Sequence, residues 1–303
     1  MSVIDEWKKG TVCAAWNLKS LLKNPRTYLC MTMGFLLCFL LTDRTIELSR
    51  QFVTDVQIFE PFVWCFADSD SILFATLVLM LLLTELPRTD APAAYLMFRA
   101  SRTSWLIGQL FTVVAVSIGY TVFLLLSSMA LCAGTTYWGN KWSETAMLLS
   151  FAPDNFEVAL RVIRKTVKLT TPYDCTFHVC LLMTQYTLFL SALQLFLTVY
   201  KSKRAAVSVV LTVNVVAYLL IPDRFMTWLN LDDQMRYVAN LISAWLSPLQ
   251  HATYIMHNFG YDYLPRLWVT YVMMGSLTIL LFVASFVVLR VRGISFSGGN
   301  EYE

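Results

Sequence analysis

The chain contains three histidines and seven cysteines, the side chains that most often carry metal or nucleophilic chemistry in proteins. The densest group is Cys175, His178 and Cys180. Its spacing matches no standard zinc-ligand pattern, and no CxxC pair occurs in the sequence. The sequence therefore predicts no metal site, no cofactor and no disulfide framework.

Sequence motifs of the common catalytic sites are also missing. The patterns GxxxxGK[ST], GxSxG and HExxH do not occur in the sequence. Without a phosphate-binding loop, the chain cannot bind ATP in the P-loop manner. We therefore expect no catalytic residue, and any ATP hydrolysis that the protein uses would come from a separate subunit.

The composition indicates the kind of secondary structure in which these residues lie. Of the 303 residues, 57% are hydrophobic and 14% are charged, whereas a soluble domain carries roughly 25% charged residues. Several uncharged stretches are long enough to cross a bilayer core of roughly 30 Å. Because these runs are continuous rather than alternating, each crossing must be a helix and not a barrel strand. The predicted fold is an all-α integral membrane protein, and the net charge of +3 does not indicate nucleic acid as a partner.

Windows without charge predict six transmembrane helices within a domain that covers residues 27–289. These spans are residues 27–42, 61–86, 105–133, 176–200, 205–221 and 267–289. The inner segments of this arrangement hold more than half of the 23 Lys and Arg residues in about a fifth of the chain. The positive-inside rule then places both termini in the cytoplasm of a multi-pass plasma membrane protein.

The segments outside the spans predict short helices. Residues 1–26 form an amphipathic helix that lies on the inner membrane surface or packs on a neighbouring helix. Its apolar face is formed by Ile4, Trp7, Thr11, Ala14, Leu18, Leu21 and Leu22. The outer segment 134–175 predicts a helix near residues 155–168, and the outer segment 222–266 predicts two short external helices or a re-entrant pair, broken at Ser247. Residues 290–303 form a cytoplasmic tail.

Polar residues inside the predicted spans are few and mostly neutral. Asp68 and Asp70 lie at the outer end of the second span, and Glu85 lies at its inner end. Because ion-driven carriers and cation channels usually need a buried ionisable group, this scarcity argues against both classes. The fourth span places four neutral polar residues within an arc of roughly 80°, and the fifth span adds one more. These residues line a translocation path or join helices: Thr184, Thr187, Ser191, Gln194 and Asn214.

Residues 84–111, TELPRTDAPAAYLMFRASRTSWLIGQLF, join the second span to the third. This segment resembles the corresponding region of ABC-2-type exporter permeases, in which an acidic residue closes the second span and a short basic helix precedes a W/L-x-x-G-K/Q entry to the third. The matching residues are Glu85, Arg99, Ser101, Arg102, Trp105, Gly108 and Gln109. The chain departs from many members at Ala100 and Gln109, where those proteins have Pro and Lys. An N-terminal amphipathic helix, six spans and external helices before the last span are features that these permeases share.

The resemblance implies the permease subunit of an ATP-driven exporter. Such a subunit pairs with a second permease chain and with two copies of a separate ABC-type ATPase subunit, whose closure opens the path outward. The inner segment would dock on the ATPase through Glu85, Arg88, Asp90, Arg99, Ser101, Arg102 and Trp105. The residues alone leave a second interpretation open, in which the arginines anchor helix ends at anionic membrane lipid.

Two other classes of function stay open at the level of sequence. A membrane-embedded enzyme or assembly protein would need ionisable groups to converge at one membrane face, and Asp68, Asp70 and the outer histidines are the candidates. An ATP-independent carrier or channel would need charge within its spans, and the spans offer little.

Overall fold

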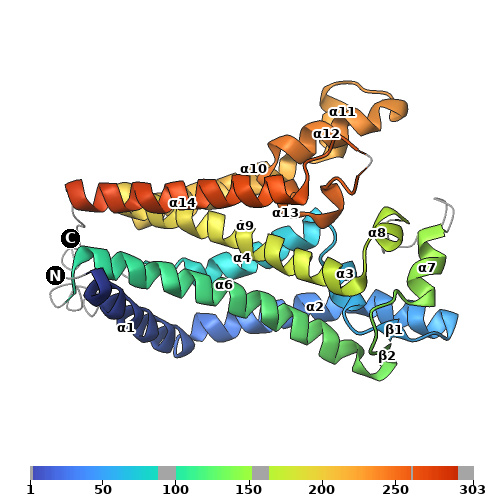
Figure 1. Ribbon diagram of the computed structural model, residues 1–303, viewed down its shortest axis with the longest axis horizontal. Helices are drawn as coiled ribbons and strands as arrows, with labels where there is room; N and C mark the ends of the chain where they lie inside the picture. The colour runs from blue at the N-terminus through green and yellow to red at the C-terminus, as the bar shows by residue number, and fades with distance from the viewer. Residues whose placement is uncertain (1–2, 88–99, 152–163, 261, 293–303) are drawn as a thin grey trace, which may run out of the picture.

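The computed structural model describes residues 3–87, 100–151, 164–260 and 262–292. Four of its helices are long and apolar enough to cross a membrane. They are α2 (Pro25–Phe52), α6 (Arg102–Cys132), α9 (Pro172–Tyr200) and α14 (Leu267–Arg292). The four run side by side along the long axis of the molecule (Figure 1). The chain is thus an all-α protein with the helices of a multi-pass membrane protein.

A fifth crossing is formed only if two helices are counted as one. Helix α10 (Lys203–Leu219) is followed by α11 (Pro222–Trp228), and the pair is bent by 70°. Pro222 occupies the first turn of α11, where its missing N–H costs nothing, and it cannot continue the preceding helix. Helix α10 covers most of the predicted span 205–221, so the predicted crossing ends at this bend.

The predicted second span is not one continuous helix. Residues 61–86 divide into α3 (Glu60–Cys65) and α4 (Ser69–Leu83). Asp68 lies between them in an extended conformation (φ −105°, ψ 158°) and begins α4. The run Asp-Ser-Asp favours a helix start over a helix interior, because these short polar side chains compete for backbone hydrogen bonds. The 15-residue α4 is about 22 Å long at 1.5 Å per residue, shorter than a bilayer core.

The first predicted span is part of a longer helix. Helix α2 has 28 residues and continues ten residues beyond Thr42 to Phe52. Its start is fixed by Asn24, whose side-chain oxygen accepts a hydrogen bond from the Arg26 N–H at 3.0 Å. The added turns carry exposed charged residues, among them Asp43 and Arg44. The apolar window therefore located the apolar part of the helix and missed its polar extension.

Helix α1 (Val3–Leu22) packs along the first turns of α6. A Cβ atom added to Gly108 would lie 2.7 Å from the Cys13 Cβ and 3.1 Å from the Gly10 carbonyl oxygen, so the two backbones approach closely here. The buried face consists of Gly10, Cys13, Ala14, Asn17 and Leu21. Ile4, Trp7, Thr11 and Leu22 of the predicted apolar face are exposed instead. Small residues allow the close crossing at Gly10 and Gly108. The Trp7 ring also packs against the Phe111 ring of α6, with 5.7 Å between the ring centres.

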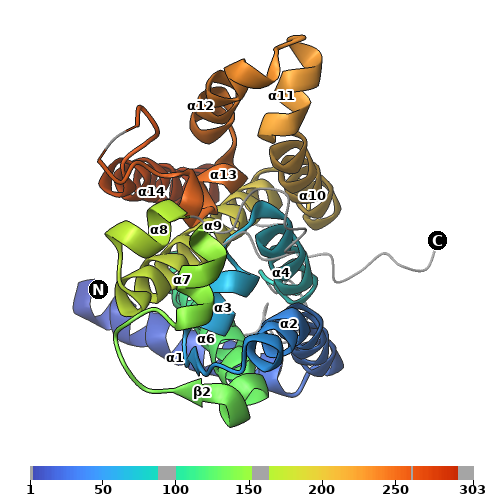
Figure 2. The ribbon, with the colours of Figure 1, turned by 90° about the vertical axis from the view of Figure 1, so that its right-hand side faces the viewer.

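The end of the bundle where α1 and α6 begin and α14 ends is called the proximal end here, and the opposite end the distal end (Figure 1). Short elements cover the distal end, which faces the viewer in Figure 2. They are the parallel pair β1 (Val56–Gln57) and β2 (Thr136–Tyr137), α7 (Glu144–Phe151), α8 (Arg164–Leu169), α12 (Arg236–Leu246), α13 (Pro248–Ala252) and the 3-10 turns η1 (Ala133–Thr135), η2 (Asp233–Met235) and η3 (Tyr254–Met256).

Some predicted elements are visible in this cover. Helices α12 and α13 separate at Ser247, where the sequence predicts a break. Of the helix predicted near residues 155–168, α8 describes the last part, and residues 155–163 lie outside the described residues. The predicted tail 290–303 is described only to Arg292, where α14 ends.

Helix α9 is the most buried of the four long helices and contacts α6, α10 and α14. Most of its core contacts belong to one large hydrophobic cluster, which includes Leu182, Tyr186 and Leu190. A smaller cluster at the proximal end joins Trp105 and Leu106 to Leu195 and Leu289. By contrast, α14 keeps 22% of its apolar window buried, which leaves most of that helix for contact with lipid.

Candidate functional site

The segment that the sequence marks for ATPase docking begins at an ion pair with α2. Arg26, on the first turn of α2, pairs with Glu85, which follows α4. The Arg26 Nη1 also donates to the Thr84 hydroxyl at 3.5 Å. The Glu85 side chain is 23% exposed and the Arg26 side chain 54%, so water screens the pair and its main effect is on position. It fixes the end of α4 against the start of α2.

The other edge of the docking segment is tied to α1. The Ser101 side chain caps α6 by accepting the Ser104 N–H at 3.1 Å, and it donates to the Glu6 carboxylate at 3.3 Å. Arg102 is exposed beside this cap. We call Glu6, Arg26, Glu85, Ser101 and Arg102 the proximal cluster.

The structure divides the remaining predicted docking residues into two groups. Trp105 of α6 is 3% exposed and belongs to a hydrophobic cluster with Leu195 of α9 and Leu289 of α14. It therefore contributes to the packing of these helices and presents no surface to a partner. Arg88, Asp90 and Arg99 lie outside the described residues. The described chain leaves the cluster at Pro87 and returns to it at Ala100, so both ends of the intervening segment are anchored at the proximal end.

The neutral polar residues of α9 and α10 form contacts within the bundle. The Asn214 carboxamide accepts from the Tyr186 hydroxyl at 2.6 Å and donates to the Thr76 hydroxyl at 3.3 Å, which joins α10, α9 and α4. Gln194 donates to the carbonyl oxygens of Leu83 (2.7 Å) and Leu86 (3.0 Å) at the end of α4. These bonds join α9 to the end of α4 and to the residues that follow it.

The other three of these neutral polar residues, all on α9, bond to α6 or within α9 itself. Thr184 donates to the Thr121 hydroxyl of α6 at 3.3 Å. Thr187 and Ser191 donate to carbonyl oxygens of α9 itself, at 2.8 and 2.6 Å. Thr187, Ser191, Gln194 and Asn214 are each at most 4% exposed. A role for these polar residues in a translocation path stays a prediction.

A small cavity lies beside Gln194, between α4, α6 and α9. Its volume is about 10 Å³, which is the space of one water molecule. Gln109 lines it, and the Gln109 side-chain oxygen is buried without a hydrogen-bond partner among the described residues. One bound water would satisfy this oxygen, so the cavity suits a structural water and is too small for a transported substrate.

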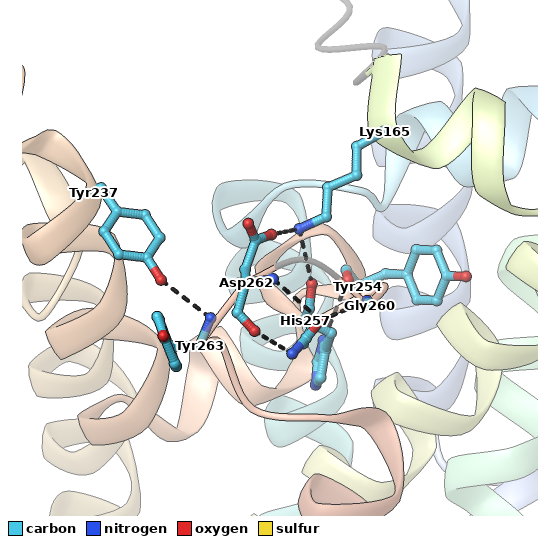
Figure 3. A network of polar contacts seen from close by, with 8 residues as sticks. Lys165, Tyr237, Tyr254, His257, Gly260, Asp262 and Tyr263 are labelled. Carbon is cyan, nitrogen blue, oxygen red and sulfur yellow. Dashed lines mark hydrogen bonds and ion pairs between the residues drawn. The ribbon is translucent and has the colours of Figure 1, made fainter.

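Charged and polar contacts close the distal end (Figure 3). Lys165 of α8 forms an ion pair with Asp262, and its ammonium also donates to the His257 carbonyl oxygen at 3.3 Å. The same ammonium lies 5.2 Å from the centre of the Phe259 ring. The Tyr237 hydroxyl accepts the Tyr263 N–H at 3.1 Å. These bonds hold the loop before α14 to α8 and α12.

The three histidines also lie at the distal end, and each is hydrogen-bonded to a hydroxyl group of α14. His178 bonds to the Tyr271 hydroxyl at 2.8 Å. Thr270 lies 3.1 Å from the His251 Nδ1 and 3.0 Å from the His257 Nε2. The His257 Nδ1 faces two carbonyl oxygens, so this nitrogen carries the proton. Burial lowers the pKa of His257 to about 4 and also lowers the pKa of His251, so both rings are neutral near pH 7.

The candidates for membrane-embedded catalysis do not converge. Asp68 and Asp70 line a distal cavity of about 550 Å³, and no histidine is among the described residues of its wall. In the described part of the chain, no group of three or more His, Cys, Asp or Glu side chains is placed to hold a metal ion. Cys175, in the second turn of α9, is fully buried in the core.

Sequence reasoning missed several residues that the structure brings into these sites. Arg26 was assigned only to the basic inner face, and its partner Glu85 is 59 residues away, so no local pattern links them. Glu6 was not linked to Ser101 for the same reason. The small residues Gly10 and Gly108 could have indicated the contact between α1 and α6, because small residues mark close helix crossings in membranes.

Comparison of the chain with models of protein families, with curated proteins and with solved structures finds no match.

Proposed function

We propose that the protein is the permease subunit of an ATP-driven exporter. The observation that carries this proposal is the proximal cluster. It consists of two separate contacts: Arg26–Glu85 joins the start of α2 to the end of α4, and Glu6–Ser101 joins the start of α1 to the start of α6. A force applied to the segment between Pro87 and Ala100 would therefore act on four helices through short, polar contacts.

The helices themselves support the same function. At least four of them are long and apolar enough to cross a bilayer, and α4 and the bent pair α10–α11 lie between them. We place six crossings, with both termini in the cytoplasm of a plasma membrane protein. The unusually short α4 then crosses a locally thinned bilayer or relies on its polar flanks. Helix α1 lies at the cytoplasmic membrane boundary, with Ile4, Trp7 and Leu22 toward lipid.

Energy for transport enters this arrangement from outside the chain, since the sequence has no phosphate-binding loop. We propose that two copies of an ABC-type ATPase subunit supply it and that a second permease chain completes the path. Arg102 is exposed and carries a permanent charge, which suits a bidentate bond to a carboxylate of the partner. Glu85 already pairs with Arg26, so its role is to position the segment rather than to contact the partner.

Photo-cross-linking tests this proposal. The photoreactive residue p-benzoyl-phenylalanine is placed at position 102 of the full chain, and at position 50 as the matched control, because Arg50 is an equally exposed arginine at the distal end of α2. Irradiation in native membranes should attach a P-loop ATPase subunit to position 102 and not to position 50. Adducts of lipid alone at position 102 would support membrane anchoring and contradict docking.

A further inference from the structure

The distal cavity is large enough to hold a small molecule. Its volume of about 550 Å³ lies within the usual range of ligand sites. It is bounded by α2, by the turn between α3 and α4, by the bend between α10 and α11, and by the segment from α12 to η3. Because four separate parts of the chain meet around it, the cavity is a feature of the tertiary fold and not a gap within one loop.

Carboxylates outnumber guanidinium groups in the cavity wall. Asp68 and Asp70 lie at the start of α4, and Asp223 at the start of α11. Asp223 forms an ion pair of 2.7 Å with Arg236. Arg44 is the other cation of the wall, and it lies 3.8 Å from Glu47 on the next turn of α2. The wall therefore carries a net negative charge near Asp68 and Asp70, which favours a cationic ligand.

The wall also contains a buried polar group that is open to hydrogen bonding. Gln250 is 3% exposed and lines the cavity. No hydrogen bond to its side-chain carboxamide is formed within the part of the chain that the structure describes, although its backbone N–H caps α13 through Ser247. Because Gln250 lines the cavity, its carboxamide is available to bond to a polar group of a ligand.

Apolar and aromatic side chains complete the wall. Leu40 and Leu41 of α2, Trp64 of α3, and Tyr218 and Ile221 near the end of α10 line the cavity. Aromatic faces attract cations, so Trp64 and Tyr218 add to the preference that the carboxylates set. The wall thus offers an apolar side and an anionic side within one volume.

We propose that the distal cavity binds an amphiphilic organic cation. The cationic group lies near Asp68 and Asp70, a polar group of the ligand bonds to the Gln250 carboxamide, and the apolar body packs against Leu40 and Trp64. Leu40 and Leu41 precede the exposed charged turns of α2 that begin at Asp43, so the cavity lies where the apolar surface of the bundle ends. Amphiphilic cations concentrate at that boundary of a membrane. Binding requires neither nucleotide nor an ATPase partner, so this inference stands apart from the proposed function.

A matched pair of ions tests the inference. Tetraphenylphosphonium and tetraphenylborate have nearly the same shape and apolar surface but opposite charge. Binding of each ion to the full chain in nanodiscs of zwitterionic lipid is measured by equilibrium dialysis, and uptake by empty nanodiscs is subtracted. Saturable binding is expected for the phosphonium only. Binding that equals the empty nanodisc, or equal saturable binding of both ions, would overturn the proposal.

Variants locate the binding. Removing one carboxylate a few ångströms from the cation should weaken binding about tenfold, so D68N/D70N should bind the phosphonium at least tenfold more weakly. Asn240 lines the same cavity, and N240D should tighten binding several-fold. The control D55N removes an exposed carboxylate outside the wall and should bind like the unmodified protein. A variant that gains affinity cannot owe its effect to misfolding, and unchanged affinity in both D68N/D70N and N240D would contradict the assignment of the site.

Discussion

The close crossing of α1 and α6 makes a sharp prediction about a single methyl group. In G108A, the added Cβ would lie 2.7 Å from the Cys13 Cβ and 3.1 Å from the Gly10 carbonyl oxygen. Carbon atoms in contact prefer about 3.5–4.0 Å, so α1 must move away by roughly 1 Å. Overpacking of this kind typically costs about 1–3 kcal/mol. The cost falls on the contact between the two helices and not on either helix alone.

The Cys13 thiol reports on this contact. Cys13 lies on the face of α1 that packs against α6, and it is 5% exposed. A maleimide therefore reaches it only when α1 moves away from α6. A loss of about 1–3 kcal/mol raises the open population, and the labelling rate with it, by roughly 5- to 150-fold. Alkylation of the full chain with N-ethylmaleimide, resolved by peptide mass spectrometry, measures the rate at Cys13 separately from the other six cysteines.

A second glycine of the same helix supplies the control. A Cβ on Gly119 would meet no atom within 4 Å, so G119A adds the same helix propensity to α6 without a clash. G119A should therefore label Cys13 at the rate of the unmodified protein. Equal rates in G108A and the unmodified protein, or the same acceleration in both variants, would refute the crossing as the structure draws it.

Three further predictions concern buried polar groups. Burial raises the pKa of Glu60 from 4.5 to about 7, despite hydrogen bonds from the Ser143 N–H and hydroxyl. Between these pH values the folded state holds a proton that the unfolded state has released, so the free energy of unfolding should fall as pH rises from 4.5 to 7, by about 3 kcal/mol in total. Thermal unfolding of E60Q should lack this slope, and a wild-type slope in E60Q would exclude Glu60 as its source. N214L leaves the Tyr186 hydroxyl unpaired and should destabilise the protein by about 1–3 kcal/mol, whereas the double variant N214L/Y186F should recover part of the loss, because both partners are then apolar. Strictly additive losses would argue against that bond. Q194L removes both bonds to the end of α4 and should lower the unfolding temperature, while T212V, whose hydroxyl bonds only within its own exposed turn, should leave it unchanged; equal effects would contradict a special role for Gln194.

The class of fold could be predicted from composition, because charge-free apolar windows report directly on burial in lipid. Long helices cover the predicted first, third, fourth and sixth spans. The second span was predicted as one helix, because hydropathy averaged over a window hides a short polar break such as Asp68 to Asp70. The predicted first span, residues 27–42, lies within a longer helix, since a helix can continue into water beyond its apolar part.

The candidate sites could be predicted only where the pattern is local. The Ser101 cap and the arc of polar residues on α9 follow from spacing along one helix. The ion pair of Arg26 with Glu85, the bond of Glu6 to Ser101 and the distal cavity depend on which helices are neighbours. One sequence carries no direct information about such pairings. The same holds for α1, whose closest approach to α6 lies at Gly10 and Gly108, and neither glycine is part of the predicted apolar face.

Nucleotide hydrolysis tests the central claim most directly. The full chain is purified from native membranes, and vanadate-sensitive ATP hydrolysis by the material that accompanies it is measured for the unmodified protein, for R99E/R102E and for R50E, a charge reversal at the distal end. We predict hydrolysis with the unmodified protein and with R50E, and its loss with R99E/R102E. Full hydrolysis with R99E/R102E, or no vanadate-sensitive hydrolysis with the unmodified protein, would contradict it.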